Sequence, residues 1–304
     1  MKKKVSLPPT FRYIAAFLTM RCNLRCGYCL NNIDQIKGFS RKDYQEINGK
    51  DWVQALNKIE SRKEVPVTFC GGEPFLHKDF IYIINNLKPS LNIDILTNLQ
   101  WGGAGLSRFI SEVNPARVRR TAKYPSIRVS YHPEQMGKGE ELVKNTKKLQ
   151  AAGFSIGIYS VLYPSPDNLE AAVQMQFRCL DAGVDFRMKD FVGRYEGVDN
   201  SGQPFSISYG DYSRYAGSVF QKTKKSCLCK TTDLIISPNG NIYRCHRDLY
   251  KPENPVGNIL DKDFTIEDQF RKCGSYGNCH PCDVKVKTDY KQQLGHTSVE
   301  IKLP

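Results

Sequence analysis

Short apolar runs alternate with longer amphipathic runs over the first two-thirds of the chain. Between the short runs, apolar residues recur at helical spacing, as in residues 51–62 and at Phe80, Ile83, Ile84 and Leu87. Strands that alternate with helices in this way predict a parallel sheet with crossover helices, and therefore an α/β fold of six strand–helix units. The runs that read as strands are 12–19, 65–70, 92–97, 127–131, 155–162 and 184–189.

The alternating pattern stops after Phe191. Residues 193–204 are rich in Gly, Asp and Asn, and residues 209–220 have the spacing of one connecting helix. Further on, residues 234–237 and 242–245 flank Pro-Asn-Gly-Asn, which is a hairpin signal. We therefore expect three parts: a core over 1–198, a linker with a connecting helix over 199–226, and a small C-terminal domain over 227–304.

Composition excludes several classes of protein. With 40% apolar and 25% charged residues among 304, the chain is globular. No run approaches the roughly 18 apolar residues of a membrane span, and Pro8, Pro9 and Arg12 follow the basic start, so we expect a cytoplasmic protein with no membrane partner. The net charge of +13 fits either scattered solvated faces or an anionic substrate or partner.

The chain has eleven cysteines. Because the cytosol keeps thiols reduced, we expect them to serve as metal ligands or catalytic groups rather than as disulfides. Cys22, Cys26 and Cys29 follow the first strand directly, spaced Cys-x3-Cys-x2-Cys. A closed zinc site normally takes four protein ligands, whereas a 4Fe-4S cluster held by three leaves one iron open. An open iron beside the ends of parallel strands is a catalytic arrangement.

This spacing, with Tyr28 before the third cysteine, resembles the signature of radical S-adenosylmethionine (SAM) enzymes. The resemblance implies a partial (β/α)6 TIM barrel in which the open iron binds the amino and carboxylate groups of SAM. It further implies reductive cleavage of SAM to a 5′-deoxyadenosyl radical, with electrons from a flavodoxin or ferredoxin-type donor.

Further positions match the family beside the cysteines. Gly71-Gly72-Glu73-Pro74 follows the second strand and resembles the motif that binds the methionine amino group of SAM. Polar residues at the ends of the next strands resemble those around the ribose and carboxylate. The resemblance thus implies cofactor-binding roles for Tyr28, Gly71, Gly72, Glu73, Pro74, Thr97, Asn98 and Ser130.

Charged and imidazole side chains at predicted strand ends are candidates for binding substrate or moving a proton. The segment from Ser130 to Glu134 departs from the Ser-x-Asp pattern of many relatives, which we attribute to the substrate. The candidate catalytic residues are His132, Glu134, Lys189, Asp190 and Arg194. Cys70 and Cys179 are expected to be buried and inert.

Six cysteines lie in the last part of the chain, around the predicted hairpin. Cys229-x10-Gly-x4-Cys245 resembles the start of the SPASM extension of radical SAM enzymes, but too few cysteines follow for two clusters. The shorter twitch domain, with one auxiliary 4Fe-4S cluster, is the better match, and zinc is the alternative. The resemblance gives Cys245, Cys279 and Cys282 as ligands, with Cys227 preferred over Cys229 as the fourth.

Three functions are open at this point. The first is removal of a hydrogen from a carbohydrate, aminocyclitol or nucleotide sugar, giving oxidation or epimerisation. The second is a ribosomal-peptide maturase, although with 21 residues before Cys22 we expect no N-terminal leader-binding domain. The third is a non-catalytic iron–sulfur or zinc protein that binds nucleic acid, which the Gly-Gly-Glu-Pro segment disfavours.

Overall fold

The computed structural model describes residues 4–29, 44–191, 193–199, 201–209, 227–274 and 299–302. All six predicted strands are present, each within about two residues of its expected bounds. They are β2 (Tyr13–Thr19), β4 (Val67–Gly71), β5 (Ile93–Thr97), β6 (Ile127–Tyr131), β7 (Ile156–Leu162) and β8 (Asp185–Asp190).

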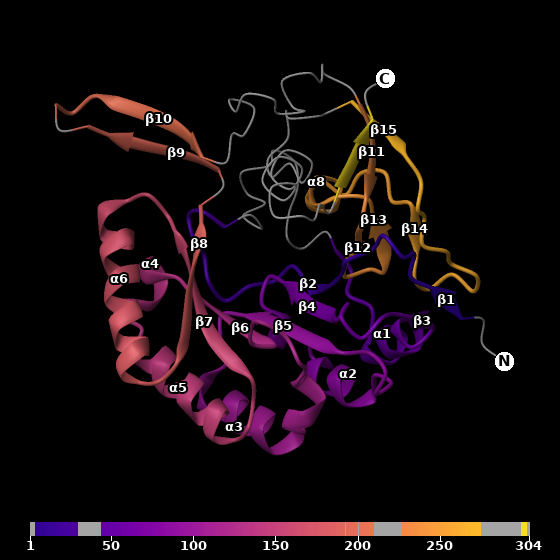
Figure 1. The fold of residues 1–304 in the computed structure, drawn as a ribbon, viewed down its shortest axis with the longest axis horizontal. Coiled ribbons are helices and arrows are strands. Elements are labelled where there is room, and N and C mark those ends of the chain that lie inside the picture. The colour runs from indigo at the N-terminus through magenta and orange to yellow at the C-terminus, as the bar shows by residue number, and fades with distance from the viewer. Residues whose placement is uncertain are drawn as a thin grey trace.

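These six strands are parallel and neighbour one another in chain order, β2-β4-β5-β6-β7-β8. The connecting helices lie together along one side of the sheet (Figure 1). The predicted α/β class with a parallel sheet is therefore confirmed, and all six strands end at the same edge. The helices are α2 (Phe80–Asn86), α3 (Gly102–Glu112), α5 (Glu140–Ala151) and α6 (Pro166–Asp181).

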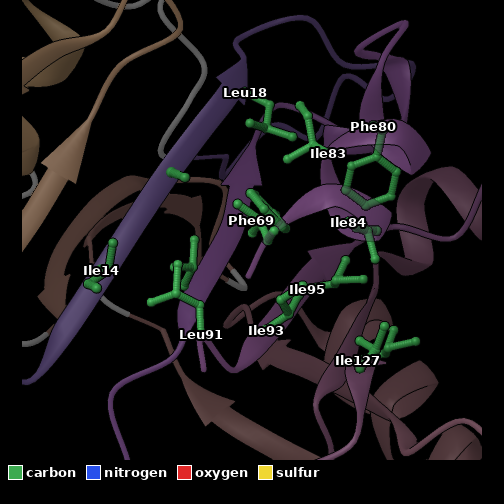
Figure 2. Close-up of a cluster of buried hydrophobic side chains, with 14 of the residues drawn as sticks. Ile14, Leu18, Phe69, Phe80, Ile83, Ile84, Leu91, Ile93, Ile95 and Ile127 are labelled. Carbon is green, nitrogen blue, oxygen red and sulfur yellow. The ribbon is translucent and has the colours of Figure 1, made fainter. Parts of the chain in front are cut away.

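The main core lies between the sheet and these helices. Alternate residues of each strand point into it, and α2 contributes residues at the spacing that the sequence predicted. Figure 2 shows this layer, in which Leu18, Phe69 and Ile95 lie beside Phe80 and Ile84. Because the strands are buried on this face, their opposite face and their carboxyl ends remain to carry polar groups.

The C-terminal part joins the same sheet. β12 (Asp233–Ile236) and β13 (Asn241–Tyr243) form the predicted hairpin, and β14 (Gly257–Asn258) adds to it. β12 also pairs in parallel with β2, so nine strands form one sheet. The second core cluster joins Ala15 and Phe17 of β2 to Ile235 and to α8 (His246–Tyr250). The division at residue 227 stays a prediction.

The structure corrects two local predictions. The helix expected over 51–62 is α1 (Gly49–Leu56), and the residues after it form β3 (Ile59–Glu60), which pairs with β1 (Val5–Ser6). Pairing with β1 buries Ile59 completely.

The second correction concerns the residues after Phe191, where a hairpin of β9 (Gly193–Val198) and β10 (Pro204–Tyr209) crosses the boundary expected between the core and the linker. The turn forms because the Asp199 carboxylate accepts hydrogen bonds from the backbone of Ser201 and Gln203. Tyr209 therefore belongs to a strand, and the rest of the predicted connecting helix lies outside the described residues. Figure 1 shows this hairpin projecting beyond β8.

The remaining elements are short. A separate sheet consists of β11 (Cys227–Thr231) between β15 (Arg271–Cys273) and β16 (Val299–Lys302). Single turns form η2 (Pro74–Leu76), η3 (Pro115–Val118) and α4 (Pro133–Met136). Within the described residues, no helix is both long and apolar enough to span a bilayer.

Candidate functional site

The first three cysteines lie on the loop that leaves the carboxyl end of β2. Cys26 is buried, Cys22 and Cys29 are partly exposed, and the Cys29 N–H donates to the Cys26 carbonyl at 3.2 Å. Burial, with smaller contributions from the neighbouring Cys29, Glu134 and Cys22, raises the pKa of the Cys26 thiol to about 12. The sulfurs of Cys22 and Cys29 therefore lie within electrostatic range of the Cys26 sulfur, and a bound metal would hold these thiols as thiolates.

Two glycines let the end of β4 lie directly against this cysteine loop. The N–H groups of Gly72 and Glu73 donate to the carbonyls of Thr19 and Arg21, both at 2.8 Å. A Cβ on Gly72 would lie 1.9 Å from the Arg21 oxygen, and one on Gly71, whose φ is +135°, 2.0 Å from that of Thr19. Only glycine fits at either position, because the backbone of this segment lies directly against the backbone of Thr19 and Arg21.

The Glu73 carboxylate is 1% exposed and held by four donors. One oxygen accepts from Thr97 Oγ1 at 2.8 Å, Trp101 Nε1 at 3.0 Å and the Phe75 N–H at 3.2 Å, and the other from the Asn98 N–H at 2.7 Å. Burial raises the pKa of Glu73, although these hydrogen bonds lower it. Both oxygens are engaged within the protein, so Glu73 fixes β4 to the end of β5. Its expected contact with SAM stays a prediction.

The turn after β5 points an amide at the cysteine loop. Asn98 Nδ2 lies 3.7 Å from Cys22 Sγ and donates to Asn23 Oδ1 at 2.8 Å. The next residue, Leu99, is buried with a φ of +55°, a conformation that costs a non-glycine residue about 1 kcal/mol or more. The strained turn is stabilised by hydrogen bonds from Leu99 N to Thr97 Oγ1 and from Gln100 N to Asn98 Oδ1.

His132 and Glu134 contact the same loop from the end of β6. Glu134 accepts from the Gly27 N–H at 2.7 Å, and His132 Nδ1 lies 3.1 Å from the Tyr28 hydroxyl. Burial lowers the pKa of His132 to about 4, so the imidazole is neutral near pH 7 and forms a neutral hydrogen bond with the Tyr28 hydroxyl. Both residues thus position the cysteine loop, and their predicted contact with substrate remains untested.

The other candidate residues lie farther round the sheet. Lys189 and Asp190 are exposed at the end of β8, and Ser130 is partly exposed on β6 opposite Tyr159 of β7. Arg194 belongs to β9, and its side chain lies outside what is described. Pro74 begins the turn η2 and is buried. The structure therefore brings Tyr28, Gly71, Gly72 and Asn98 to the cysteine loop but not Ser130, and the cofactor and catalytic roles stay predictions.

A second group of cysteines surrounds Arg244. Burial lowers the pKa of this guanidinium, but nearby Cys229, Asp248, Cys245 and Cys273 raise it above its usual value. The backbone of Cys227 pairs with that of Cys273 between β11 and β15. Cys279 and Cys282 lie outside the described residues. Cys70 and Cys179 are buried, as predicted.

Sequence reasoning missed three residues that hold the loop. Glu46 binds Arg21 through both oxygens, at 2.8 and 2.9 Å, and also accepts from Thr19. Burial raises the pKa of Glu46, but Arg21 and Thr19 lower it below its usual value. Trp101 donates to Glu73, and Tyr163 stacks on Tyr28 with ring centroids 4.7 Å apart. Nothing in their local sequence indicated these contacts.

Three cysteine thiols are the donor set of a 4Fe-4S cluster that has one open iron. Over the described stretches, no three His, Cys, Asp or Glu side chains are placed to ligate one metal ion. In a 4Fe-4S cluster each cysteine ligates a different iron, so the sulfurs need only surround a common volume. The three thiols lie on one loop, and the Asn98 amide lies 3.7 Å from the sulfur of Cys22.

Comparison with known proteins bears on the same residues. The family model described as "Radical SAM superfamily" matches residues 17–175, which run from the end of β2 through β7 and include the cysteine loop. A solved structure of a histidine-tagged protein, described as "anSMEcpe with bound AdoMet", is 14% identical, with a TM-score of 0.48 over 83% of this chain and 75% of that chain. Since the family model spans more than half of its residues, the chain belongs to the radical SAM superfamily.

Proposed function

We propose that this protein cleaves SAM reductively and uses the resulting radical to modify a polar small molecule. The observation that carries the proposal is the cysteine loop packed against the Gly71-Gly72 backbone, in a chain of the radical SAM superfamily. When bound, the cluster supplies one electron that breaks the S–C5′ bond of SAM, and the 5′-deoxyadenosyl radical then removes a hydrogen atom from a substrate carbon.

The protein's own groups would hold the cluster and SAM in place within a partial (β/α)6 barrel. Cys22, Cys26 and Cys29 supply the thiolates, and the Asn98 amide beside Cys22 orients toward the sulfur. Glu134 and His132 fix the loop between the second and third cysteines through Gly27 and Tyr28. The close packing of Gly71 and Gly72 holds the end of β4 against the cysteine loop, and the family resemblance implies that this segment would bind the methionine end of SAM.

We further propose that the second cysteine group holds one auxiliary 4Fe-4S cluster. Cys245 would be a ligand with Cys279 and Cys282, and with Cys227 or Cys229 as the fourth. The gathering of Cys229, Cys245 and Cys273 around Arg244 supports a metal centre here and adds Cys273 as a candidate. Such a cluster would accept the second electron in an oxidation or lie beside a thiol donor in an epimerisation. A flavodoxin or ferredoxin-type protein would supply the first electron.

The test of the SAM site uses the anaerobically reconstituted chain with dithionite and SAM. We expect 5′-deoxyadenosine from the wild type and from Cys179→Ala, whose thiol is buried in α6 outside the site, but none from Cys26→Ala. An unchanged yield in Cys26→Ala would refute the site. Iron near eight per chain, falling to about four in Cys245→Ser, would support the auxiliary cluster.

The substrate class is tested by incubating the reconstituted enzyme with candidate sugars, aminocyclitols and nucleotide sugars in deuterated water. Epimerisation is expected to introduce one deuterium, whereas oxidation lowers the product mass by two hydrogens. If only a peptide substrate raises the yield of 5′-deoxyadenosine, the small-molecule proposal is wrong.

A further inference from the structure

The sheet face opposite the helices carries polar residues on β6, β7 and β8. Successive side chains of a strand point to opposite faces of the sheet. Val129 and Ile158 point into the helix-side core, so their chain neighbours Arg128 and Tyr159 point to this face. The register agrees, since Ser130 lies opposite Tyr159, which lies opposite Arg187. This surface, here called the β6–β8 inner face, is part of the sheet whose strand ends lie at the cysteine loop.

Two donors on the inner face are buried without a hydrogen-bond partner. The Tyr159 side chain is 9% exposed, and its hydroxyl has no partner among the described residues. The same holds for Nε of Arg128, whose other nitrogen binds Asp94 at 3.3 Å. Buried polar groups are nearly always paired, so these orphaned groups point to a ligand that the chain itself does not supply. Since a guanidinium only donates, that ligand carries acceptor atoms.

Positive charge exceeds negative charge around these donors. Lys189 Nζ lies 5.6 Å and the Arg187 guanidinium 5.9 Å from the centroid of the Tyr159 ring. Asp185 pairs with Arg187 at 3.0 Å. Asp94 is shared by Arg128 and Arg120. Two guanidinium groups thus share the single carboxylate of Asp94, and this local excess of positive charge favours an anionic ligand.

The distance to the cysteine loop suits one small substrate. Tyr159 lies three residues before Leu162, the last residue of β7, which is about 10 Å along a strand. The next residue, Tyr163, stacks on Tyr28 of the cysteine loop. An anionic group at Tyr159 would therefore leave the rest of a small molecule extending toward the cysteines.

We propose that the β6–β8 inner face binds an oxyanion of the substrate, phosphoryl or carboxylate, through Tyr159 Oη, Arg128 Nε and Lys189. This inference rests on the proposed function and narrows its substrate class to anionic small molecules. Tyr159 supplies a hydroxyl donor, Arg128 a directed N–H, and Lys189 a charge beside the ring.

The test measures binding of inorganic phosphate and of acetate to the reconstituted chain by calorimetry. We expect at least one anion to bind the wild type, with binding weakened roughly tenfold in Tyr159→Phe, since a hydrogen bond to a charged group is lost. Lys189→Gln should weaken binding severalfold. Lys262→Gln, which changes an exposed lysine in a distant loop, should bind as the wild type does. Preference for phosphate or for acetate assigns the oxyanion.

A second measurement guards against variants that merely misfold. The bound anion should raise the melting temperature of the wild type and have little effect on that of Tyr159→Phe. Equal binding by wild type and Tyr159→Phe, or no binding of either anion, would overturn the inference. Failure of this inference can be told apart from failure of the proposed function. The inference is tested by anion binding, whereas the proposed function is tested by 5′-deoxyadenosine formation, which is measured without substrate.

Discussion

His132 illustrates how one residue's burial fixes its chemistry. Its ring forms a hydrogen bond with Tyr28 and is largely enclosed, so burial disfavours the charged form and the pKa falls to about 4. The unfolded chain titrates this imidazole near pH 6.5, and between these values the unfolded state binds more protons than the folded state. The free energy of unfolding therefore rises with pH across this window.

We predict that acidification from pH 6.5 to 4 removes up to about 3 kcal/mol of stability through His132, since each pKa unit corresponds to about 1.4 kcal/mol. His132→Gln keeps a polar group that can form a hydrogen bond with Tyr28 but does not titrate, so its stability should vary less with pH over this range. Urea unfolding at a series of pH values compares the two. Parallel profiles would show that the imidazole is not responsible.

Among single residues, the sequence predicted those that belong to short motifs, in which the members lie close together along the chain. Cys22, Cys26 and Cys29 and the Gly71-Gly72 pair are identified by spacing and meet in the fold as expected. Glu46 was not predictable, because its partner Arg21 lies far away along the chain and only tertiary structure joins them.

At the scale of the elements, the contact between the end of β4 and the cysteine loop tolerates no added side chain at Gly72. The carbonyl that opposes Gly72 is backbone, so a side chain there cannot be accommodated by a rotamer change. The loop and the strand must therefore approach as bare backbone, which restricts this crossing to glycine.

We predict that Gly72→Ala destabilises the protein by about 3 kcal/mol or more and lowers the iron content after reconstitution, because the loop is displaced. Gly103→Ala is the matched control, since a Cβ there meets nothing within 4 Å in the helix α3. It should stabilise by about 0.5–1 kcal/mol. Thermal unfolding and iron analysis measure both, and equal effects would contradict the proposed packing.

The strands of the parallel sheet were predictable because burial on the sheet makes them short apolar runs. The hairpin of β9 and β10 was not, since its Gly, Asp and Asn content is typical of loops. Its pairing depends on the turn at Asp199, a signal that composition alone obscured.

For the whole molecule, β2 connects the two halves of the sheet. It pairs with β4 on one side and with β12 on the other, and it ends at the cysteine loop. The sequence predicted the β12–β13 hairpin but not its pairing with β2, because no local pattern specifies a partner so distant in sequence.

We predict that Ile235→Asp in β12 both destabilises the chain, by roughly 3 kcal/mol or more, and reduces iron bound at the first cysteine site. Ile235 is fully buried beside Ala15 and Phe17, so an unpaired carboxylate there disturbs β2. Leu260→Asp, at a side chain 46% exposed, should change stability by less than about 0.5 kcal/mol. Urea unfolding and iron analysis report the two effects; normal iron in Ile235→Asp would mean that β12 does not support the loop.

The parallel pairing of β2 with β12 also orders events during protein synthesis. Asp233 pairs with Tyr13, so the ribosome completes nearly the entire sheet before β2 gains its second neighbour. Until then one edge of a very apolar strand stays open to other chains, which is an aggregation hazard that chaperones would need to cover. We therefore expect iron delivery to Cys22, Cys26 and Cys29 to follow the synthesis of β12 rather than that of β2.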